Sequence, residues 1–273
     1  MPAALYLVAT PIGNLEDITV RALRILKEEV DRIACEDTRH SRKLLDHYGI
    51  SKPLVSFHEH NERERGDELL HALRAGERIA VISDAGTPLI SDPGYRLVAA
   101  AAAEGIPVVP LPGPSAILTA LCASGLPTDS FVFGGFLPPK QIQRRKTLEA
   151  WSASPATLVF YEAPHRIREA LADIDTVLGS RPVVLARELT KMHEEFLRGT
   201  AAELRAGLHS ANTRGEMVIL IGRGEATMHD DRPIPQAVAD AIASGMERMD
   251  AIKHVARQRG LSKRDVYQAV TGS

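Results

Sequence analysis

The segment VISDAGTPLISDPG, residues 81–94, ends an apolar run with a loop of small residues, aspartates and prolines. Such a loop after a buried strand is typical of the carboxyl edge of a parallel sheet, where open α/β folds bind their ligands. Small side chains let a ligand approach the backbone, and proline fixes the loop before binding. The segment therefore predicts an α/β fold and a ligand site together.

Short apolar runs alternate with helical patterns on both sides of this segment. We expect strands at 5–9, 32–35, 54–57, 79–83 and 107–111. Between them we expect helices at 18–28, 39–48, 61–75, 93–104 and 114–124, several of which end at a glycine. This alternation predicts a largely parallel sheet that is covered on both faces.

A Gly- and Pro-rich stretch at 125–140 is the best candidate for a domain boundary. A second α/β set follows, with strands expected at 157–161, 182–186, near 196 and at 215–222, and helices at 140–152, 164–178 and 201–208. Three short helical patterns end the chain. We therefore predict an N-terminal α/β domain at 1–125, a second α/β domain at 126–224, and a linker with a helix-turn-helix-like segment at 225–273.

The composition is typical of a globular protein, with 44% hydrophobic and 25% charged residues and a net charge of -2. No apolar run is long enough to cross a bilayer, and the first residues do not form a signal peptide. Two cysteines fit a reduced, cytoplasmic protein. Since the histidines and cysteines lack the spacing of metal ligands, we expect no metal.

Two more segments of similar composition follow other expected strands, namely ATPIGN at 9–14 and LPGPSA at 111–116. The carboxyl ends of parallel strands meet at one edge, so we expect these loops and 83–90 to form one site. Ordinary tight turns also use Gly and Pro, so any single loop could be a plain turn without a ligand. Neither GxGxxG nor GxxxxGK[ST] follows the first strand, which disfavours a nucleotide phosphate as the ligand.

Five stretches together resemble the tetrapyrrole-methylase superfamily, and they cover nearly the whole chain: 5–45, 82–98, 108–127, VFYEAPHR at 159–166 and ARELTKMHEEFLRGT at 186–200. Within the superfamily they are similar to the small-subunit ribosomal RNA 2'-O-methyltransferases, which modify a cytidine in the decoding region. The resemblance implies S-adenosylmethionine bound in a cleft between two α/β domains, and a homodimer.

The resemblance also implies a set of cofactor contacts: Pro11, Asp84, Ala85, Gly86, Thr87, Ile90, Ser115, Ala116 and Tyr161, with Glu162 as an alternative to Tyr161. Porphyrin methylases of the superfamily typically carry GxGPG in the first loop and GGDP in the second. This chain has TPIGN and AGTP instead. The difference favours an RNA substrate over a tetrapyrrole.

Methyl transfer to a ribose hydroxyl needs alignment, exclusion of water and a group that takes the proton. Lys191 is our first candidate, because a partly desolvated lysine can be neutral and accept a proton. The alternative is a surface lysine paired with Glu188 or Glu195. Glu162 and Asp37 are further candidates, and Asp37 is equally suited to cap the helix that follows it.

Two basic stretches offer RNA contacts in a chain that is nearly neutral overall. KQIQRRK at 140–146 carries four cations and no acid, and the chain from Met246 onward has a local excess of positive charge. The expected RNA contacts are Arg39, Arg144, Arg145, Lys146, Arg166, Lys263 and Arg264. For Arg166 the alternative is an ordinary helix surface, and the C-terminal helices also suit a dimer or domain contact. Only 4% of residues are aromatic, which argues against a base-stacking surface.

The leading hypothesis is a cytoplasmic, S-adenosylmethionine-dependent 2'-O-methyltransferase that acts on small-subunit ribosomal RNA or the assembled subunit. The sequence is also compatible with two alternatives. One is a methylase of a corrinoid or porphyrin precursor, and the other is a ribosome-assembly factor without catalytic activity.

Overall fold

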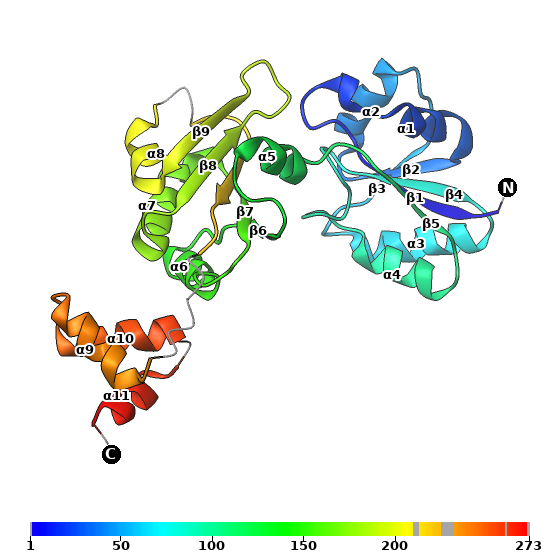
Figure 1. The fold of residues 1–273 in the computed structure, drawn as a ribbon. Coiled ribbons are helices and arrows are strands. Elements are labelled where there is room, and N and C mark those ends of the chain that lie inside the picture. Colours follow the sequence, from blue (N-terminus) through cyan, green and yellow to red (C-terminus); the bar gives the residue numbers. More distant parts are fainter. Residues whose placement is uncertain (1, 210–212, 225–231, 260, 272–273) are drawn as a thin grey trace.

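The computed structural model describes residues 2–209, 213–224, 232–259 and 261–271. Two five-stranded sheets, each with its own helices, follow one another along the chain, and a group of three helices ends it (Figure 1). Among the described helices, none combines the length and the apolarity that crossing a membrane requires.

The first sheet is wholly parallel, as expected, with the strand order β3-β2-β4-β1-β5. Its strands are β1 (Ala4–Val8), β2 (Arg32–Cys35), β3 (Leu54–Ser56), β4 (Arg78–Ile82) and β5 (Val108–Leu111). Helices α1 (Val20–Arg24) and α2 (Thr38–His47) lie on one face, and α3 (Glu62–Arg74) and α4 (Tyr95–Ala103) lie on the other (Figure 1). A 3-10 turn (Leu15–Asp17) precedes α1 and a π-helical turn (Ile25–Glu29) follows it. The two faces bury separate apolar clusters, around Leu26 and Ile33 on one and around Leu69 and Phe57 on the other.

Strand order brings the three small-residue loops together. β1 lies between β4 and β5, so the loops that follow these strands leave the same edge of the sheet. The first two loops are bonded to each other through Thr10 and Gly86, whose backbones exchange hydrogen bonds of 2.9 and 3.0 Å. Gly86 has φ +84°, which only glycine adopts without strain.

Helix α5 (Ala116–Ser124) does not cover the first sheet. Its apolar residues Ile117, Ala120 and Leu121 pack with Val184 and Val218 of the second sheet, and Figure 1 shows α5 beside that sheet. A boundary at residue 125 therefore assigns α5 to the wrong sheet. The periodicity of a helix shows which face is apolar, but not which sheet covers that face.

The second sheet is mixed, with the order β6-β7-β10-β8-β9. Its strands are β6 (Phe131–Phe136), β7 (Thr157–Glu162), β8 (Pro182–Arg187), β9 (Glu195–Thr200) and β10 (Met217–Ile221). β6 and β7 are parallel, and the remaining pairs are antiparallel. α6 (Gln141–Ala150), α7 (Ile167–Leu178), which a 3-10 turn (Pro164–Arg166) precedes, and α8 (Ala201–Gly207) accompany this sheet.

Strand β6 lies inside the stretch that the sequence suggests is a boundary. Gly134 belongs to this strand, and a Cβ built there would lie 2.3 Å from Cε1 of Phe160. The glycine is thus required by an aromatic ring on the neighbouring strand and does not mark a linker.

The C-terminal helices α9 (Ile234–Ala243), α10 (Arg248–Arg259) and α11 (Lys263–Thr271) pack on one another. They enclose their own small core, which includes Val238, Ile252, Val255 and Val266. A core of its own supports treating this group as a separate unit.

Candidate functional site

A cavity of about 430 Å³ lies between the loops of the first sheet and the second sheet. Its wall consists of Ile12, Asp84, Ala85, Gly86, Thr87, Ile90, Ser91, Asp92, Ser115, Ala116, Phe136, Tyr161, Glu162, Ala163, Pro164, Leu189, Gly215, Glu216, Met217 and Val218. The volume falls within the range of roughly 300–1,000 Å³ that is usual for small-molecule sites.

The loop of residues 83–94 forms much of one wall of this cavity. Its backbone is fixed by Ser83, whose Oγ donates to the Gly86 carbonyl at 2.8 Å, and by Thr87, whose Oγ1 donates to the Pro114 carbonyl at 3.0 Å. Leu89 and Ser91 have φ values of 72° and 68°, a left-handed conformation that side chains disfavour. Backbone strain of this kind concentrates at functional sites.

Almost all of the residues expected to contact the cofactor share this cavity. The structure brings together Asp84, Ala85, Gly86, Thr87 and Ile90 from one loop, Ser115 and Ala116 at the start of α5, and Tyr161 with Glu162 at the end of β7. The exception is Pro11, since the wall contains its neighbour Ile12 instead.

Four carboxylates line the cavity, namely Asp84, Asp92, Glu162 and Glu216, and the wall that the structure describes contains no lysine, arginine or histidine. Opposite charge attracts a ligand strongly where the walls exclude water. The cavity is therefore suited to a ligand with a net positive charge and ill suited to a phosphate.

Glu162 is 2% exposed and is held from two sides. Its Oε1 accepts from the Ala163 N–H at 2.7 Å and lies 2.7 Å from Nη2 of Arg166. Burial raises the pKa of Glu162, although the Ala163 N–H and Arg166 act against this. Its Oε2 is buried and has no hydrogen-bond partner among the described residues. A polar ligand atom in the cavity would satisfy this oxygen.

Lys191 does not have the neutral character that the sequence argument expects. Its Nζ lies 3.0 Å from Oε1 of Glu188 and 3.1 Å from Oε2 of Glu216. Burial alone would lower the pKa of Lys191, but the two carboxylates outweigh it and raise that pKa. The alternative, pairing with Glu188, is confirmed, whereas Glu195 pairs with Arg187 instead. A proton-accepting role for Lys191 stays a prediction, which this pairing disfavours.

Asp37 lies outside the cavity wall and caps α2. Its Oδ1 accepts from the N–H groups of Arg39 at 2.8 Å and His40 at 3.4 Å. These bonds, that to Arg39 above all, lower the pKa of Asp37. The capping interpretation is thus confirmed. Through its own N–H, Asp37 also donates to Oδ1 of Asp84 at 3.2 Å and so fixes a carboxylate of the wall.

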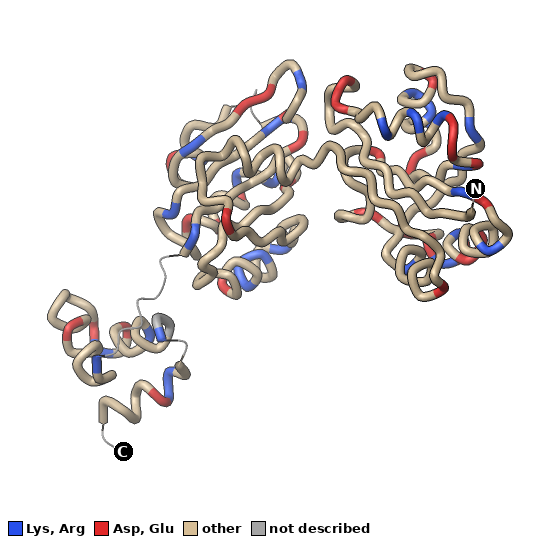
Figure 2. The backbone as a smooth tube through the Cα atoms, turned by 45° about the vertical axis from the view of Figure 1, so that its right-hand side comes forward, with Lys and Arg blue, Asp and Glu red and all other residues tan. Residues whose placement is uncertain are grey.

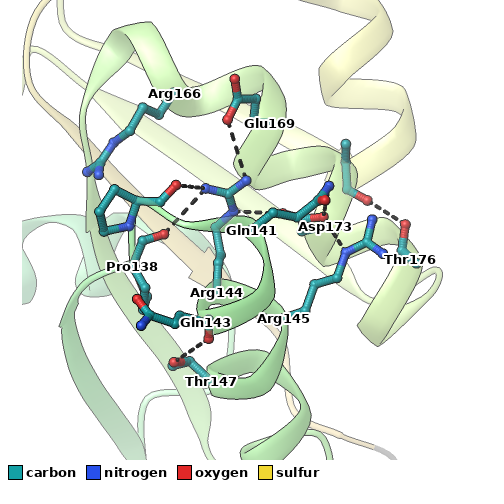
Figure 3. A network of polar contacts seen from close by, with 12 residues as sticks. Pro138, Gln141, Gln143, Arg144, Arg145, Thr147, Arg166, Glu169, Asp173 and Thr176 are labelled. Carbon is teal, nitrogen blue, oxygen red and sulfur yellow. Dashed lines mark hydrogen bonds and ion pairs between the residues drawn. The ribbon is translucent and has the colours of Figure 1, made fainter.

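The expected RNA contact at Arg144 is wrong. The side chain is 1% exposed, and its Nε lies 2.7 Å from Oδ2 of Asp173, which is fully buried (Figure 3). Arg144 also donates to the carbonyls of Pro138 and Pro139 at 3.3 and 3.2 Å. These bonds tie α6 to α7 and to the turn after β6.

Two of the other expected RNA contacts are held in ion pairs, and the rest are exposed, with Arg39 also 3.6 Å from Asp37. Arg166 is bound to Glu162 beside the cavity, and Arg145 lies 2.6 Å from Asp173. For Arg166 the sequence suggests either a phosphate contact or an ordinary helix surface. Its ion pair with Glu162 corresponds to neither. The exposed cations are Arg39, Lys146, Lys263 and Arg264.

Sequence reasoning missed several residues of the wall. Phe136 lies in the stretch that the sequence suggests is a domain boundary, and Met217 lies in an expected strand. Asp92 belongs to the opening segment but was not singled out, although ISDPG repeats the aspartate and proline of the preceding turn. That repetition is the signal that could have identified it.

Comparison with known proteins identifies the family. A profile described as Tetrapyrrole (Corrin/Porphyrin) Methylases matches residues 4–205. Two proteins named ribosomal RNA small subunit methyltransferase I are similar over nearly the whole chain. The one from Halalkalibacterium halodurans is 52% identical, covering 96% of this chain and 93% of its own. The one from Pseudomonas aeruginosa is 48% identical, covering 97% and 95%.

Solved structures show the same fold at low sequence identity. Diphthine synthase has a TM-score of 0.62 at 13% identity, with 81% of this chain and 90% of that chain covered. Uroporphyrin-III-C-methyltransferase from Thermus thermophilus has a TM-score of 0.55 at 21% identity, covering 84% and 98%. A second structure of the latter, with a TM-score of 0.55 at 20% identity and covering 80% and 97%, is described as complexed with S-adenyl homocysteine.

These likenesses confirm the expected α/β fold and the expected family. The chain belongs to the tetrapyrrole methylases and, among them, to the family of ribosomal RNA small subunit methyltransferase I.

Proposed function

We propose that this protein transfers a methyl group from S-adenosylmethionine to the ribose 2'-oxygen of a cytidine in small-subunit ribosomal RNA. Its family supports methyl transfer, and relatives of about half identity are named for the small-subunit ribosomal RNA. We propose further that it acts as a homodimer in the cytoplasm, on naked RNA or on the assembled subunit.

The observation that carries the proposal is the charge of the cavity. S-adenosylmethionine has a sulfonium and an ammonium group against a single carboxylate, so its net charge is positive. The wall offers Asp84, Asp92, Glu162 and Glu216, and no cationic side chain belongs to its described residues. Coulombic attraction in a partly dry site favours such a ligand over a nucleoside phosphate.

The same wall has groups for each part of the donor. Ser115 and Ala116 begin α5, and a helix N-terminus attracts a carboxylate. Phe136, Tyr161 and Met217 offer apolar surface for a purine ring. The unpaired Oε2 of Glu162 is free to accept from an ammonium or a hydroxyl group. When bound, the donor would supply an activated methyl group, and the residues of the wall would align it and exclude water.

RNA would be held by phosphate contacts at exposed cations. Lys146 on α6, Arg39 on α2, and Lys263 with Arg264 on α11 are exposed and lie on three separate parts of the chain. Lys and Arg are scattered over the whole molecule in Figure 2 rather than gathered in one patch. Such spacing suits a large, shaped RNA surface better than a short single strand.

Two measurements test the proposal. Isothermal calorimetry should detect binding of S-adenosylmethionine and of S-adenosylhomocysteine to the purified protein. Tritiated methyl should then pass from the donor to small ribosomal subunits, and mass mapping of RNA from cells without the protein should lack one ribose methyl. If neither donor nor product binds, or if the label reaches a tetrapyrrole and no RNA, the proposal is wrong.

A further inference from the structure

Among the described residues, no protein group engages the carboxylate of Asp92, which lines the cavity. The other three all have partners, namely Glu162 with Arg166, Glu216 with Lys191, and Asp84 with the amide of Asp37. In the described part of the chain, Asp92 has neither a hydrogen bond nor an ion pair. Its carboxylate is therefore available to a group that enters the cavity.

The backbone before Asp92 is held in an unfavourable conformation, and the backbone after it is anchored by a hydrogen bond. Ser91 precedes it with φ 68°, and Leu89 has φ 72°. After the turn, the N–H of Gly94 donates to Oε1 of Glu62 at 2.9 Å, which anchors the loop to α3. A strained loop that is anchored at both ends holds its central side chain in one place, as preorganised sites require.

Asp92 faces mainly negative surroundings. The titratable and charged groups around it are Glu36 after β2, Asp84 after β4, Glu62 at the start of α3, Tyr161 and Glu162 of β7, Glu216 before β10, and the paired cations Arg166 and Lys191. Burial, then Glu36, then Asp84 raise the pKa of Asp92 to about 6. An acid with such a pKa is mostly ionised at neutral pH and still basic enough to accept a proton.

We propose that Asp92 is the general base of the reaction, which accepts the proton of the hydroxyl group that becomes methylated. This inference rests on the proposed function. The hydroxyl oxygen forms a bond to the methyl carbon, and the electron pair of the broken carbon–sulfur bond stays on sulfur. The O–H proton passes to the Asp92 carboxylate, so the hydroxyl becomes a neutral ether and Asp92 a neutral acid.

The experiment compares Asp92→Asn with Glu36→Gln. Asp92→Asn keeps the size of the side chain but removes the base, so kcat for RNA methylation should fall by about 100-fold or more. The dissociation constant for S-adenosylhomocysteine, measured by calorimetry, should change by less than about threefold. Glu36→Gln removes a neighbouring charge from outside the cavity wall, so it should keep activity at pH 8 and move the acid limb of kcat/KM to lower pH.

The unloaded protein offers a second readout. Carbon-13 NMR of labelled aspartate should show one carboxyl that titrates near pH 6, is absent in Asp92→Asn and titrates at lower pH in Glu36→Gln. Full activity of Asp92→Asn with an unchanged pH profile would overturn the inference, and so would a loss of product binding as large as the loss of activity. A wild type that binds the donor but methylates no RNA refutes the proposed function itself, and the inference falls with it.

Discussion

Among single residues, Asp92 contributes to how stability depends on pH between about 4 and 6. Its pKa in the folded protein is about 6 instead of the usual 3.8, because of burial and the charges of Glu36 and Asp84. The folded state therefore binds this proton more tightly than the unfolded chain does, and it loses stability as the pH rises from about 4 to about 6.

We expect Asp92→Asn, which cannot ionise, to unfold at a higher temperature than the wild type at pH 8. Near pH 4 the difference should vanish, because the wild-type carboxyl is then protonated in the folded state. Thermal unfolding without ligand, at constant ionic strength, measures both values. An equally large increase in unfolding temperature at pH 4 would show that the charge of Asp92 is not its cause.

The ion pair of Lys191 with Glu188 makes stability depend on pH in the opposite direction. Burial would raise the pKa of Glu188, but the bonds from Lys191 and from the Glu216 N–H lower it. The Lys191–Glu188 pair therefore stabilises the fold above the normal pKa of a glutamate, and the stabilisation is lost as the pH falls through the lowered pKa.

Lys191→Met keeps the stem that packs on Gly13, where an added Cβ would lie 2.5 Å from Cγ of Lys191. We expect it to lower the free energy of unfolding by up to about 1 kcal/mol at pH 7 and by almost nothing at a pH below the lowered pKa of Glu188. Urea unfolding at the two pH values checks this, with Lys191→Arg as the control that keeps the charge. An equal loss at both pH values would point to packing instead.

At the scale of elements, local pattern predicted most of the helices and strands, since each buries one periodic apolar face. It failed where the decisive partner is distant in sequence. Helix α5 was correctly predicted, but the second sheet that it covers is formed later in the chain. Strand β6 was hidden by its glycines, of which Gly134 is required by the ring of Phe160. Arg144 belongs to a basic run, and nothing near it shows that Asp173 lies opposite.

The Arg144–Asp173 pair gives a prediction about how α6 and α7 are held together. Asp173 also accepts from Arg145 and from Gln141, so its loss leaves a cation with 1% exposure without its main partner. We expect Asp173→Asn to lower the free energy of unfolding by about 3–5 kcal/mol. Glu169→Gln is the control, because Glu169 is 69% exposed and lies 3.5 Å from Arg144, so its loss should cost less than about 1 kcal/mol. Chemical denaturation of both variants decides whether the buried pair has this effect.

For the molecule as a whole, the cavity exists because two sheets from different parts of the chain line it from opposite sides. Sequence alone predicted the loops of the first sheet, because strand ends in a parallel sheet share an edge. It predicted less of the opposite wall, where Phe136, Leu189 and Met217 come from separate strands and loops of a mixed sheet. No local pattern links those residues to one another.

The C-terminal helices allow a test of RNA binding that leaves the cavity intact. Lys263 and Arg264 are exposed in the first turn of α11, where the helix dipole disfavours cations, so their placement costs some stability. We expect the double variant Lys263→Ala and Arg264→Ala to bind small ribosomal subunits more weakly, with the slope of log affinity against log salt reduced by about two. Calorimetry should show unchanged affinity for S-adenosylhomocysteine, because the cavity lies within residues 12–218.

Lys253→Ala is the matched control, since Lys253 lies 2.8 Å from Asp250 on α10 and should change RNA affinity little. An unchanged salt slope in the double variant would exclude α11 from the RNA contact.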